Sequence, residues 1–581
     1  MKLWGAFVAC AVVVSTLVHW PVMHSGYIID DYLQLAMLDG TYPVRRSPLE
    51  LYSFVRSAPE LSTLIASGTM PWWSHPDFRL SPLRPLSSLS LALDYWLGLS
   101  PFAKHLHSEL WWVGLLLAFS RLARKLLPAA AAACAVLLFA LDPARLVPIA
   151  WLANRTALVS ALFGVLAFTE HWRWREEGAP RGALVSGAFW GLALLGGEYA
   201  ISTLCFPLAY ELVGRNGPWR ERARALLPSA LALFAYGVAY LGLGFGMAAN
   251  WLYVTPLSAP LVFLRSALSR LPALLANDLL LLPAEFTEAV LSTRYTEVTK
   301  LVVPLLIVGW LLWGSMRRSD QRTRRVLVFL AAALLASLLP MLATLSATRL
   351  LLTPSVASSL LIGAALWDAI ARLRAVPEAL LARLSLAASV LGAALLAVIH
   401  LLLAPWFTWT LARGTVTLRE AYRDACLKAP IDDARVSGQN VVLINGRDVL
   451  TAFYLPRVRH ADGRPLPRGF YILALSLQPV HAKRVAANVL ELEVTGGSLL
   501  DHLHVLASRP GDVAFSPNQS VEAGSLRIEI VTVGPLGPTR IRYRFAEPLE
   551  SPALRFLTAT TTGFAAFTPP APGSEVVVKF E

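Results

Sequence analysis

Two adjacent carboxylates, Asp30 and Asp31, are the side chains of this 581-residue sequence best suited to acid–base chemistry. They follow the first apolar run, in the string Gly26-Tyr-Ile-Ile-Asp-Asp-Tyr-Leu. Because neighbouring negative charges repel, one of the two would have a raised pKa, which suits a general base near neutral pH. The structural alternative is a solvated turn or a helix N-terminus, where aspartate is also common.

A second set of ionisable residues lies at the ends of apolar runs. A charge inside or beside a membrane span is costly and usually faces a cavity or a partner. On the topology predicted below, the members of this set share the outward ends of their spans: His105, His107, Arg155, Glu198 and Arg349. The alternative for each is an interfacial group that extends to water. Their common depth favours one polar site that opens outward.

Arg84 stands before Pro85, where it would begin an amphipathic helix over 83–97 that lies along the membrane surface. A guanidinium group at this position matches the oxygens of a lipid phosphate. Non-specific anchoring to lipid head groups is the alternative.

The composition explains why helices that span a membrane must position these residues. The chain is 56% hydrophobic and 15% charged, whereas soluble globular domains carry about 25% charge. Its apolar blocks approach the roughly 20 residues with which a helix crosses a bilayer. The sequence therefore predicts an α-helical polytopic membrane protein, and it excludes an ordinary soluble enzyme and a disordered chain.

About eleven spans are expected, with the N-terminus in the cytoplasm. They cover about 3–22, 105–120, 128–141, 152–170, 182–196, 199–213, 226–246, 299–315, 326–346, 350–371 and 384–405. The 51 Lys and Arg exceed the 38 Asp and Glu. This basic excess falls in short breaks between spans, which is typical of cytoplasmic loops, so we expect membrane lipids and no nucleic acid as partners.

The same topology places three longer segments on the outer side: 23–104, a loop near 249–298 and the tail 406–581. We expect 1–405 to form the transmembrane domain, including the loop 23–104, with a second amphipathic helix over 257–282. The tail holds short alternating or β-branched runs bounded by turn residues, which predicts a separate extracytoplasmic antiparallel β-sandwich. Its expected strands are 441–444, 471–477, 489–494, 526–533 and 539–545.

Several chemistries lack their motifs in this sequence. No phosphate-binding G-x-x-x-x-G-K-[ST] occurs, which disfavours ATP-driven transport by this chain alone. Neither H-E-x-x-H nor G-x-S-x-G is present, which disfavours two classes of hydrolase. No His or Cys residues show metal-ligand spacing, so no metal ligand is assigned. No cofactor is indicated, and a divalent metal stays open as an alternative.

Taken in order, the motifs resemble the membrane glycosyltransferases of superclass C (GT-C), which include protein O-mannosyltransferases and lipid A aminoarabinose transferases. The resemblance covers residues 1 to about 370 and extends in particular to multispanning bacterial members with Pro-Trp-Trp and His-x-His-Ser. Its strings are Asp30-Asp31, Pro71-Trp-Trp, Arg84-Pro-Leu, Lys104-His-Leu-His-Ser, Trp151-Leu-Ala-Asn-Arg-Thr, Leu194-Leu-Gly-Gly-Glu and Arg349-Leu-Leu-Leu-Thr-Pro. Compared with the tetratricopeptide-bearing O-mannosyltransferases, the chain has Ser108, Trp112 and Gly197 where Asn, His and Lys are usual.

The resemblance implies transfer of a sugar from a polyprenyl-phosphate donor to a protein, lipid or glycan at the outer face of the cytoplasmic (inner) membrane. Asp30 or Asp31 would be the catalytic base of an inverting displacement. The lipid phosphate would be bound by Arg84, His105, Arg155 and Arg349, with His107 and Glu198 in support.

Two alternatives stay open. One is a degenerate relative that binds a lipid-linked glycan, or acts as an assembly partner, without chemistry. The other is a secondary transporter, which is disfavoured because no pair of Gly- or Pro-interrupted spans occupies corresponding halves of the chain.

Overall fold

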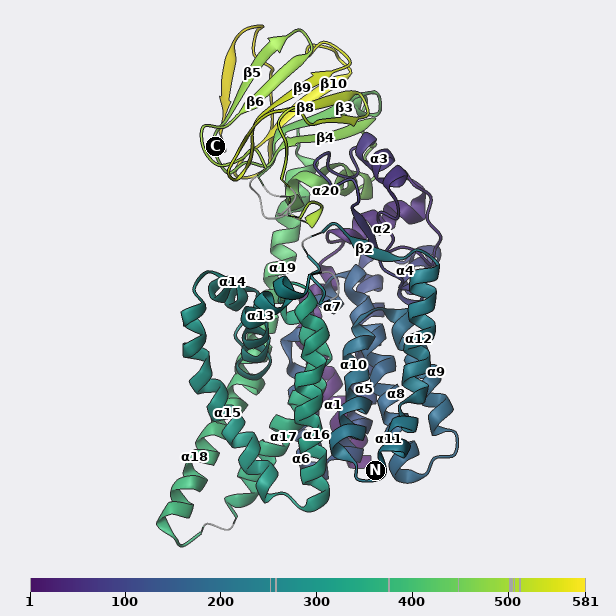
Figure 1. Ribbon diagram of the computed structural model, residues 1–581, viewed down its shortest axis with the longest axis vertical. Coiled ribbons are helices and arrows are strands. Elements are labelled where there is room, and N and C mark those ends of the chain that lie inside the picture. The colour runs from purple at the N-terminus through teal and green to yellow at the C-terminus, as the bar shows by residue number, and fades with distance from the viewer. Residues whose placement is uncertain are drawn as a thin grey trace. The chain divides into compact units, whose positions relative to one another are not determined.

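The chain forms two compact units (Figure 1). The structure is a computed structural model that describes residues 2–250, 252–256, 259–374, 377–447, 449–500, 505, 507–510 and 514–579. The helical unit comprises 1–26, 84–243 and 253–416, and the mixed unit comprises 27–83, 244–252 and 417–581. The sequence led us to expect a boundary at 405/406 with the whole loop 23–104 in the transmembrane domain, whereas residues 27–83 of that loop cluster with the tail.

The helical unit has a helix in each of the ranges predicted as spans. These helices are α1 (Lys2–His19), α5 (Pro101–Leu126), α6 (Ala129–Leu141), α8 (Arg155–Glu177), α9 (Gly182–Gly196), α10 (Tyr199–Ala209), α12 (Leu227–Gly242), α15 (Val298–Arg318), α16 (Gln321–Leu338), α17 (Pro354–Arg372) and α18 (Leu380–Ala397). Shorter or flanking helices are α7 (Leu146–Ala150), α11 (Trp219–Ala225), α14 (Ala284–Thr293) and α19 (Ala404–Leu427). The last of these runs well past the predicted end of the final span and carries the chain from the helical into the mixed unit.

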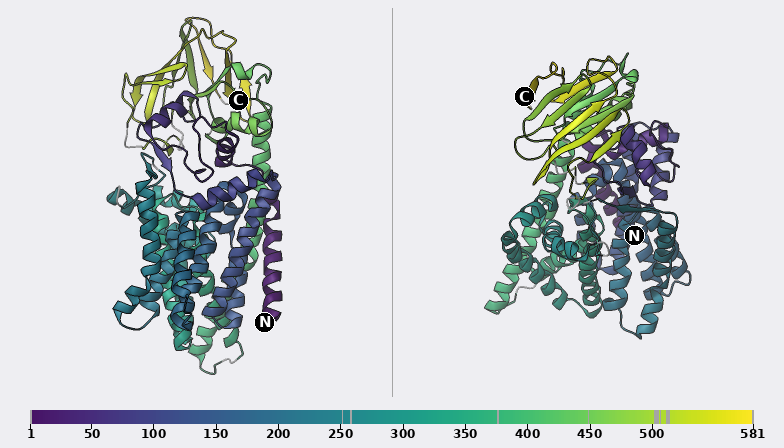
Figure 2. Two further views of the ribbon diagram at one scale, coloured as in Figure 1. Left: turned by 90° about the vertical axis from the view of Figure 1, so that its right-hand side faces the viewer. Right: turned by 45° about the horizontal axis from the view of Figure 1, so that its top comes forward.

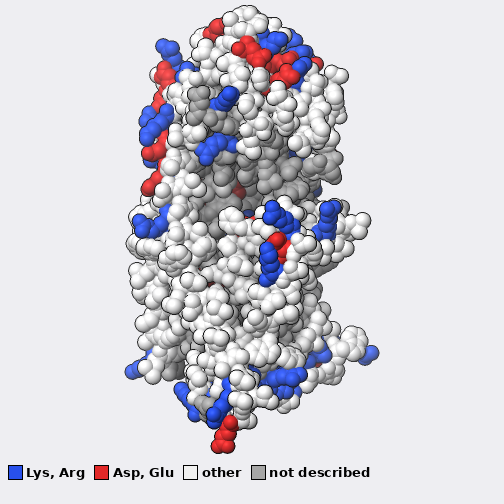
Figure 3. Space-filling model, turned by 90° about the vertical axis from the view of Figure 1, so that its left-hand side faces the viewer, with Lys and Arg blue, Asp and Glu red and all other residues white. Residues whose placement is uncertain are grey.

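Within the described residues, six helices are long and apolar enough to cross a membrane, or eight if each of two bent pairs counts as one span. The count of about eleven therefore stays a prediction. Helices α9 and α10 have 15 and 11 residues, which is shorter than the roughly 20 residues that cross a bilayer straight. On the face drawn in Figure 3, the helical unit shows a broad band without charged side chains and basic groups at its lower end, as expected of a membrane-embedded surface.

Both predicted amphipathic helices are present. The first is α4 (Pro85–Trp96), in which proline occupies the first turn and therefore costs no hydrogen bond. The second is α13 (Pro260–Leu280), whereas residues 257 and 258 of the predicted range lie outside the described residues. Helix α4 buries polar side chains along with apolar ones, including Ser87, Ser90 and Asp94. This polar buried face becomes important below.

The mixed unit contains a six-stranded sheet, a four-stranded sheet and a two-stranded ribbon. The six-stranded sheet is antiparallel, in the order β12-β5-β6-β9-β8-β7, and the four-stranded sheet has the order β11-β10-β3-β4. The five predicted strands are present as β3 (Asn440–Asn445), β4 (Gly469–Ala474), β6 (Val489–Glu493), β8 (Leu526–Gly534) and β9 (Gly537–Phe545). The others are β1 (Arg79–Ser81), β2 (Gly246–Ala248), β5 (Val480–Ala486), β7 (Ser520–Ala523), β10 (Leu554–Ala559), β11 (Phe564–Ala566) and β12 (Glu575–Val578).

The prediction of a wholly antiparallel tail is wrong. Strand β3 pairs in parallel with both β4 and β10. Parallel neighbours cannot be joined by a tight turn and need a crossover, which is helix α20 (Val449–Ala461) between β3 and β4. The sequence analysis missed this helix, whose interior contains Pro456, a residue that ordinarily argues against a helix.

The segment 27–83 packs as part of the mixed unit. It supplies α2 (Asp30–Asp39), α3 (Ala58–Ala66) and β1, which pairs with β2, and Figure 2 shows its purple ribbon beside the green and yellow strands. The buried Trp72 donates from Nε1 to the carbonyl of Ile472 in β4 at 3.1 Å. The Tyr471 hydroxyl donates to the carbonyl of Ala66 at 2.9 Å. Residues some 400 positions apart in the chain therefore share one core.

Candidate functional site

The segment from Trp151 to Thr156 is the hub of the polar contacts in the helical unit. Four of its side chains reach different partners: Trp151 contacts Arg349, Asn154 contacts Tyr199, Arg155 contacts Asp94, and Thr156 contacts Gly196. The segment comprises the connection between α7 and α8, with a short turn of 3-10 helix over Leu152–Asn154, and the first two residues of α8. One sequence motif thus contains Arg155 and contacts Arg349, two of the predicted site residues of this unit.

Arg155 is fully buried and surrounded by protein acceptors. Its Nη2 lies 2.7 Å from Asp94 Oδ2 and donates to the carbonyl of Lys104 at 2.7 Å. Its Nε donates to Ser108 Oγ and its Nη1 to Ser90 Oγ, both at 2.9 Å. These bonds occupy the guanidinium fork, so Arg155 joins α4, α5 and α8 and presents no open face to a ligand.

Asp94 completes this cluster together with His107. Burial would raise the pKa of Asp94, but hydrogen bonds to His107 and Arg155 and the charge of Arg155 outweigh it and hold the pKa below its ordinary value. Trp111 Nε1 donates to His107 Nε2 at 3.1 Å, while His107 Nδ1 lies 2.5 Å from Asp94 Oδ1. Because Nε2 accepts, the proton of a neutral His107 lies on Nδ1 and is donated to Asp94.

Arg84 and Glu198 form a second ion pair, with Arg84 Nε 2.7 Å from Glu198 Oε2. Between α9 and α10, Gly197 has φ +149°, and a Cβ placed on it would lie 2.2 Å from Thr156 Oγ1. Both facts require glycine at this backbone. The position where related proteins carry lysine therefore has no room here for a side chain in this conformation.

His105 is buried and contacts two backbone carbonyls. Its Nε2 lies 2.8 Å from the carbonyl oxygen of Gly26, and its Nδ1 lies 3.1 Å from that of Ile149. The ring therefore bridges the segment that follows α1 and helix α7. Such a position fixes the backbone around the hub segment.

The side chain of Arg349 contacts an aromatic ring, whereas those of Arg84 and Arg155 form ion pairs. Arg349 lies in a 3-10 turn (Thr348–Leu352) before α17, with its guanidinium carbon 5.1 Å from the centroid of the Trp151 ring. Within the described part of the chain, no ion pair or hydrogen bond of its side chain is present. Among the described residues, three buried polar atoms of the same unit also lack hydrogen-bond partners: Trp151 Nε1, Asn154 Nδ2 and Glu198 Oε1.

The phenol of Tyr253 is under the electrostatic influence of Arg84, Arg349 and Glu198. Burial raises the pKa of its phenol, the positive charges of Arg84 and Arg349 oppose that rise, and Glu198 adds to it. One side chain thus lies within electrostatic reach of both cations and of the carboxylate. A donor-rich, cationic site with one carboxylate acceptor suits an anionic ligand that also carries hydroxyl groups.

The two adjacent carboxylates of the mixed unit have different surroundings. Asp31 is buried at 4% exposure, and its Oδ2 accepts from the backbone N–H of Ile28 at 2.9 Å. Asp30 is half-buried, and the hydroxyl of Tyr454 in α20 lies 3.3 Å from its Oδ1. Ile29, just before them, has φ +48°, a strained conformation for a β-branched residue. Backbone strain of this kind concentrates at functional sites.

Tyr454 stays protonated beside this pair. Burial raises the pKa of its phenol well above the ordinary value, and the charge of Asp30 raises it further. The hydroxyl therefore donates to Asp30 rather than competing for its proton. Asp30 is left as the more accessible carboxylate of the two, whereas Asp31 stabilises the turn that begins α2.

Sequence reasoning missed several residues that these contacts involve. Asp94 carried a signal, since it is an acid inside a predicted amphipathic helix. Asn154 and Trp151 stood inside a quoted motif without a role, and Tyr253 and Tyr454 gave no local signal. Among the described residues, no group of three or more His, Cys, Asp or Glu side chains lies close enough together to hold a metal ion.

Comparisons with known proteins find a local match to a protein O-mannosyl-transferase. No protein-family model matches the sequence. Over 200 residues the chain is 33% identical to the protein O-mannosyl-transferase Tmtc2 of Drosophila melanogaster, covering 30% of this chain and 21% of that protein. The chain thus spans about a fifth of the length of this relative.

Matches among solved structures have low sequence identity and TM-scores below 0.5. The apo oligosaccharyltransferase of Archaeoglobus fulgidus matches with a TM-score of 0.42 and 12% identity, over 80% of this chain and 64% of that one. ArnT from Cupriavidus metallidurans bound to undecaprenyl phosphate matches with a TM-score of 0.41 and 15% identity, over 81% of this chain and 89% of that one. The local match to a protein O-mannosyl-transferase agrees with the resemblance predicted from the ordered motifs.

Proposed function

We propose that the protein is a membrane glycosyltransferase that moves a sugar from a polyprenyl-phosphate donor to an acceptor hydroxyl at the outer face of the cytoplasmic membrane. One observation carries this proposal. The helical unit holds a cation, Arg349, over the Trp151 ring. It also holds two buried N–H donors, of Trp151 and Asn154, and one buried carboxylate oxygen, of Glu198, that have no hydrogen-bond partner among the described residues. Buried polar groups are normally satisfied, so this arrangement points to a ligand.

The chemistry of these atoms fits a sugar phosphate. Arg349, Trp151 and Asn154 offer donors to phosphate oxygens, and the guanidinium fork suits a phosphate group in particular. Glu198 Oε1 accepts from a sugar hydroxyl, while its other oxygen holds Arg84 in place. Arg84 adds positive charge where the leaving phosphate gains negative charge.

The proposed step is a single displacement. The acceptor oxygen attacks the anomeric carbon, a new C–O bond forms, and the bond from that carbon to the phosphate oxygen breaks. The electron pair of the broken bond stays on the lipid phosphate, and the proton of the acceptor hydroxyl passes to a carboxylate of the Asp30 and Asp31 pair. Asp30 suits the role of base because it is more exposed than Asp31, and inversion at the anomeric carbon follows.

Arg155 and His105 receive positioning roles in this proposal, in place of the phosphate contacts expected from sequence. Their polar atoms are engaged by protein groups, and both side chains are fully buried. They fix the segment that presents Trp151 and Asn154. His107 acts in the same way through Asp94.

The proposal is tested with purified full-length protein in lipid nanodiscs, supplied with undecaprenyl-phosphate-linked sugars. Release of undecaprenyl phosphate is followed together with retention of the donor. Asp30→Asn is expected to lower turnover by about 10²–10⁴-fold, the usual contribution of a general base, with donor retention unchanged. Arg349→Ala is expected to weaken donor retention itself.

Asp77→Asn is the matched control, because Asp77 lies in the same segment with its side chain exposed to solvent. It is expected to keep wild-type turnover. If Asp30→Asn and Asp31→Asn, singly and together, keep full turnover, the assignment of the base is wrong. If no polyprenyl-phosphate sugar is retained or turned over by the folded wild type, the function is wrong.

A second candidate function is favoured by Gly197. The lysine that is usual before the glutamate is absent, and the backbone has no space for it, so the site has one cation fewer. A protein that binds a lipid-linked glycan without turnover fits this loss. Donor retention without release of undecaprenyl phosphate over hours, unchanged in Asp30→Asn, would establish this second function instead.

A further inference from the structure

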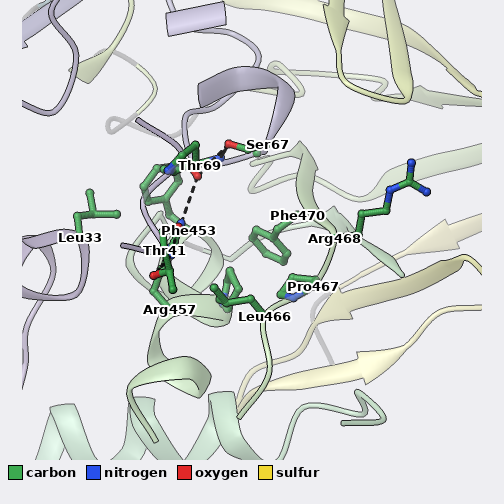
Figure 4. Close-up of a pocket in the computed structure, with 13 residues that line it drawn as sticks. Leu33, Thr41, Ser67, Thr69, Phe453, Arg457, Leu466, Pro467, Arg468 and Phe470 are labelled. Carbon is green, nitrogen blue, oxygen red and sulfur yellow. Dashed lines mark hydrogen bonds between the residues drawn. The ribbon is translucent and has the colours of Figure 1, made fainter. Parts of the chain in front are cut away.

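A cavity of about 170 Å³ lies within the mixed unit and has no role in the chemistry described above (Figure 4). Its walls come from three separate parts of the chain: α2 and the residues that follow it, the turn after α3, and α20 with the start of β4. One wall is polar and is formed by Thr41, Ser67, Thr69 and Arg457. The aromatic rings of Phe453 and Phe470 also line the cavity.

The polar wall is held together by its own hydrogen bonds. Arg457 Nη1 donates to Thr41 Oγ1 at 3.1 Å, and its Nη2 donates to Thr69 Oγ1 at 3.4 Å. Ser67 Oγ lies 3.0 Å from Thr69 Oγ1. Burial lowers the pKa of Arg457, and three hydroxyl groups are grouped around it. The wall is thus an ordered array of donors and acceptors on one side of a small cavity.

Gly68 lies between Ser67 and Thr69 and lets the turn that carries them pack against β4. Its φ is +72°, and a Cβ placed on it would lie 1.7 Å from the backbone oxygen of Phe470. Only glycine lets the turn approach β4 so closely. The approach brings Ser67 and Thr69 opposite the ring of Phe470.

We propose that this cavity binds one sugar ring of a glycan acceptor. A sugar ring has hydroxyl groups on its edge and a C–H surface on its faces, so it needs a polar wall and an aromatic wall together. The volume is below that of sites for drug-sized ligands and matches a single ring. A hydroxylated peptide also carries hydroxyl groups, but its extended backbone would not fill so compact a space.

The position of the cavity near Asp30 supports the binding of a glycan acceptor. This inference rests on the proposed function. Leu33, which lines the cavity, lies three residues after Asp30, about 5 Å along α2. Tyr454, which contacts Asp30, and Arg457, which forms the polar wall, are likewise three residues apart on α20. A sugar held in the cavity would place a neighbouring ring of the same glycan near Asp30.

The test measures binding of sugars to full-length protein in nanodiscs by saturation-transfer difference NMR. The probes are the methyl glycosides of mannose, glucose, galactose and N-acetylglucosamine, and a threonine-containing tripeptide. At least one glycoside is expected to bind the wild type. Arg457→Ala and the nearly isosteric Thr69→Val are each expected to weaken that binding about tenfold, as for a lost hydrogen bond to a charged group.

Arg435→Ala is the matched control, because the Arg435 side chain is exposed to solvent and does not line the cavity. Its binding is expected to equal that of the wild type. Binding that is equal in Arg457→Ala, Thr69→Val and the wild type overturns the inference, as does the tripeptide binding in place of every glycoside. Turnover of the wild type separates the two proposals: if the wild type has no turnover but its glycoside binding depends on Arg457, the proposed function fails and the cavity assignment stands.

Discussion

Replacing Asp94 by asparagine is expected to destabilise the helical unit strongly. The amide side chain would keep the shape of the carboxylate but remove the counter-charge of Arg155, whose guanidinium is 0% exposed. Breaking a buried ion pair in this way costs about 3–5 kcal/mol, because an uncompensated charge stays in a medium of low polarity. The neutral bonds of Arg155 to Ser90, Ser108 and Lys104 would not replace the lost charge.

The magnitude can be checked with a second variant that removes both charges. Asp94→Leu combined with Arg155→Met leaves no buried ion, so it is expected to lose less stability than Asp94→Asn alone. The assay is thermal unfolding of the detergent-solubilised protein at a fixed heating rate, since unfolding of large proteins is often irreversible. An unfolding temperature of Asp94→Asn equal to that of the wild type, or above that of the double variant, would refute the reasoning.

The effect of Asp94 also has a defined pH dependence. Its pKa in the folded protein lies below the ordinary value of about 3.8. The stabilisation by its charge is therefore complete above that ordinary value and is lost as the pH falls through the lower folded value. The difference in unfolding temperature between the wild type and Asp94→Asn is expected to be constant from about pH 5 to 7 and to shrink below about pH 4.

Three further variants test other parts of the structure. Trp72→Ala removes a buried ring and its hydrogen bond to Ile472, so it should lower the free energy of unfolding by about 3–5 kcal/mol and make the mixed unit more sensitive to limited proteolysis. Unchanged resistance to the protease would contradict the shared core. Gly197→Lys should lower the unfolding temperature, with partial recovery when Thr156→Ala frees space, and no loss would refute the steric argument. Arg349→Ala should reduce co-purifying polyprenyl phosphate, measured by mass spectrometry, whereas the exposed Arg294→Ala should not.

Much of the local structure could be predicted from the sequence. Each range predicted as a span contains a helix, and five tail strands lie where alternating or β-branched runs predicted them. These features depend on the residues of the segment itself, because hydrophobic patterning repeats within a few residues. The ordered motifs also agree with the local match to a protein O-mannosyl-transferase. The local pattern could not say how many of the helices are long enough to cross a membrane.

The tertiary structure decided which of the predicted side chains are enclosed by protein partners. Arg155 and Arg349 looked alike in the sequence, yet one is enclosed by Asp94, Ser90 and Ser108, while the other contacts the Trp151 ring. The parallel pairing of β3 and the joining of Trp72 to β4 were equally out of reach. Each depends on a partner far away in the chain. The type of a side chain is thus written in the sequence, but its burial and its partner are set only when distant segments pack together.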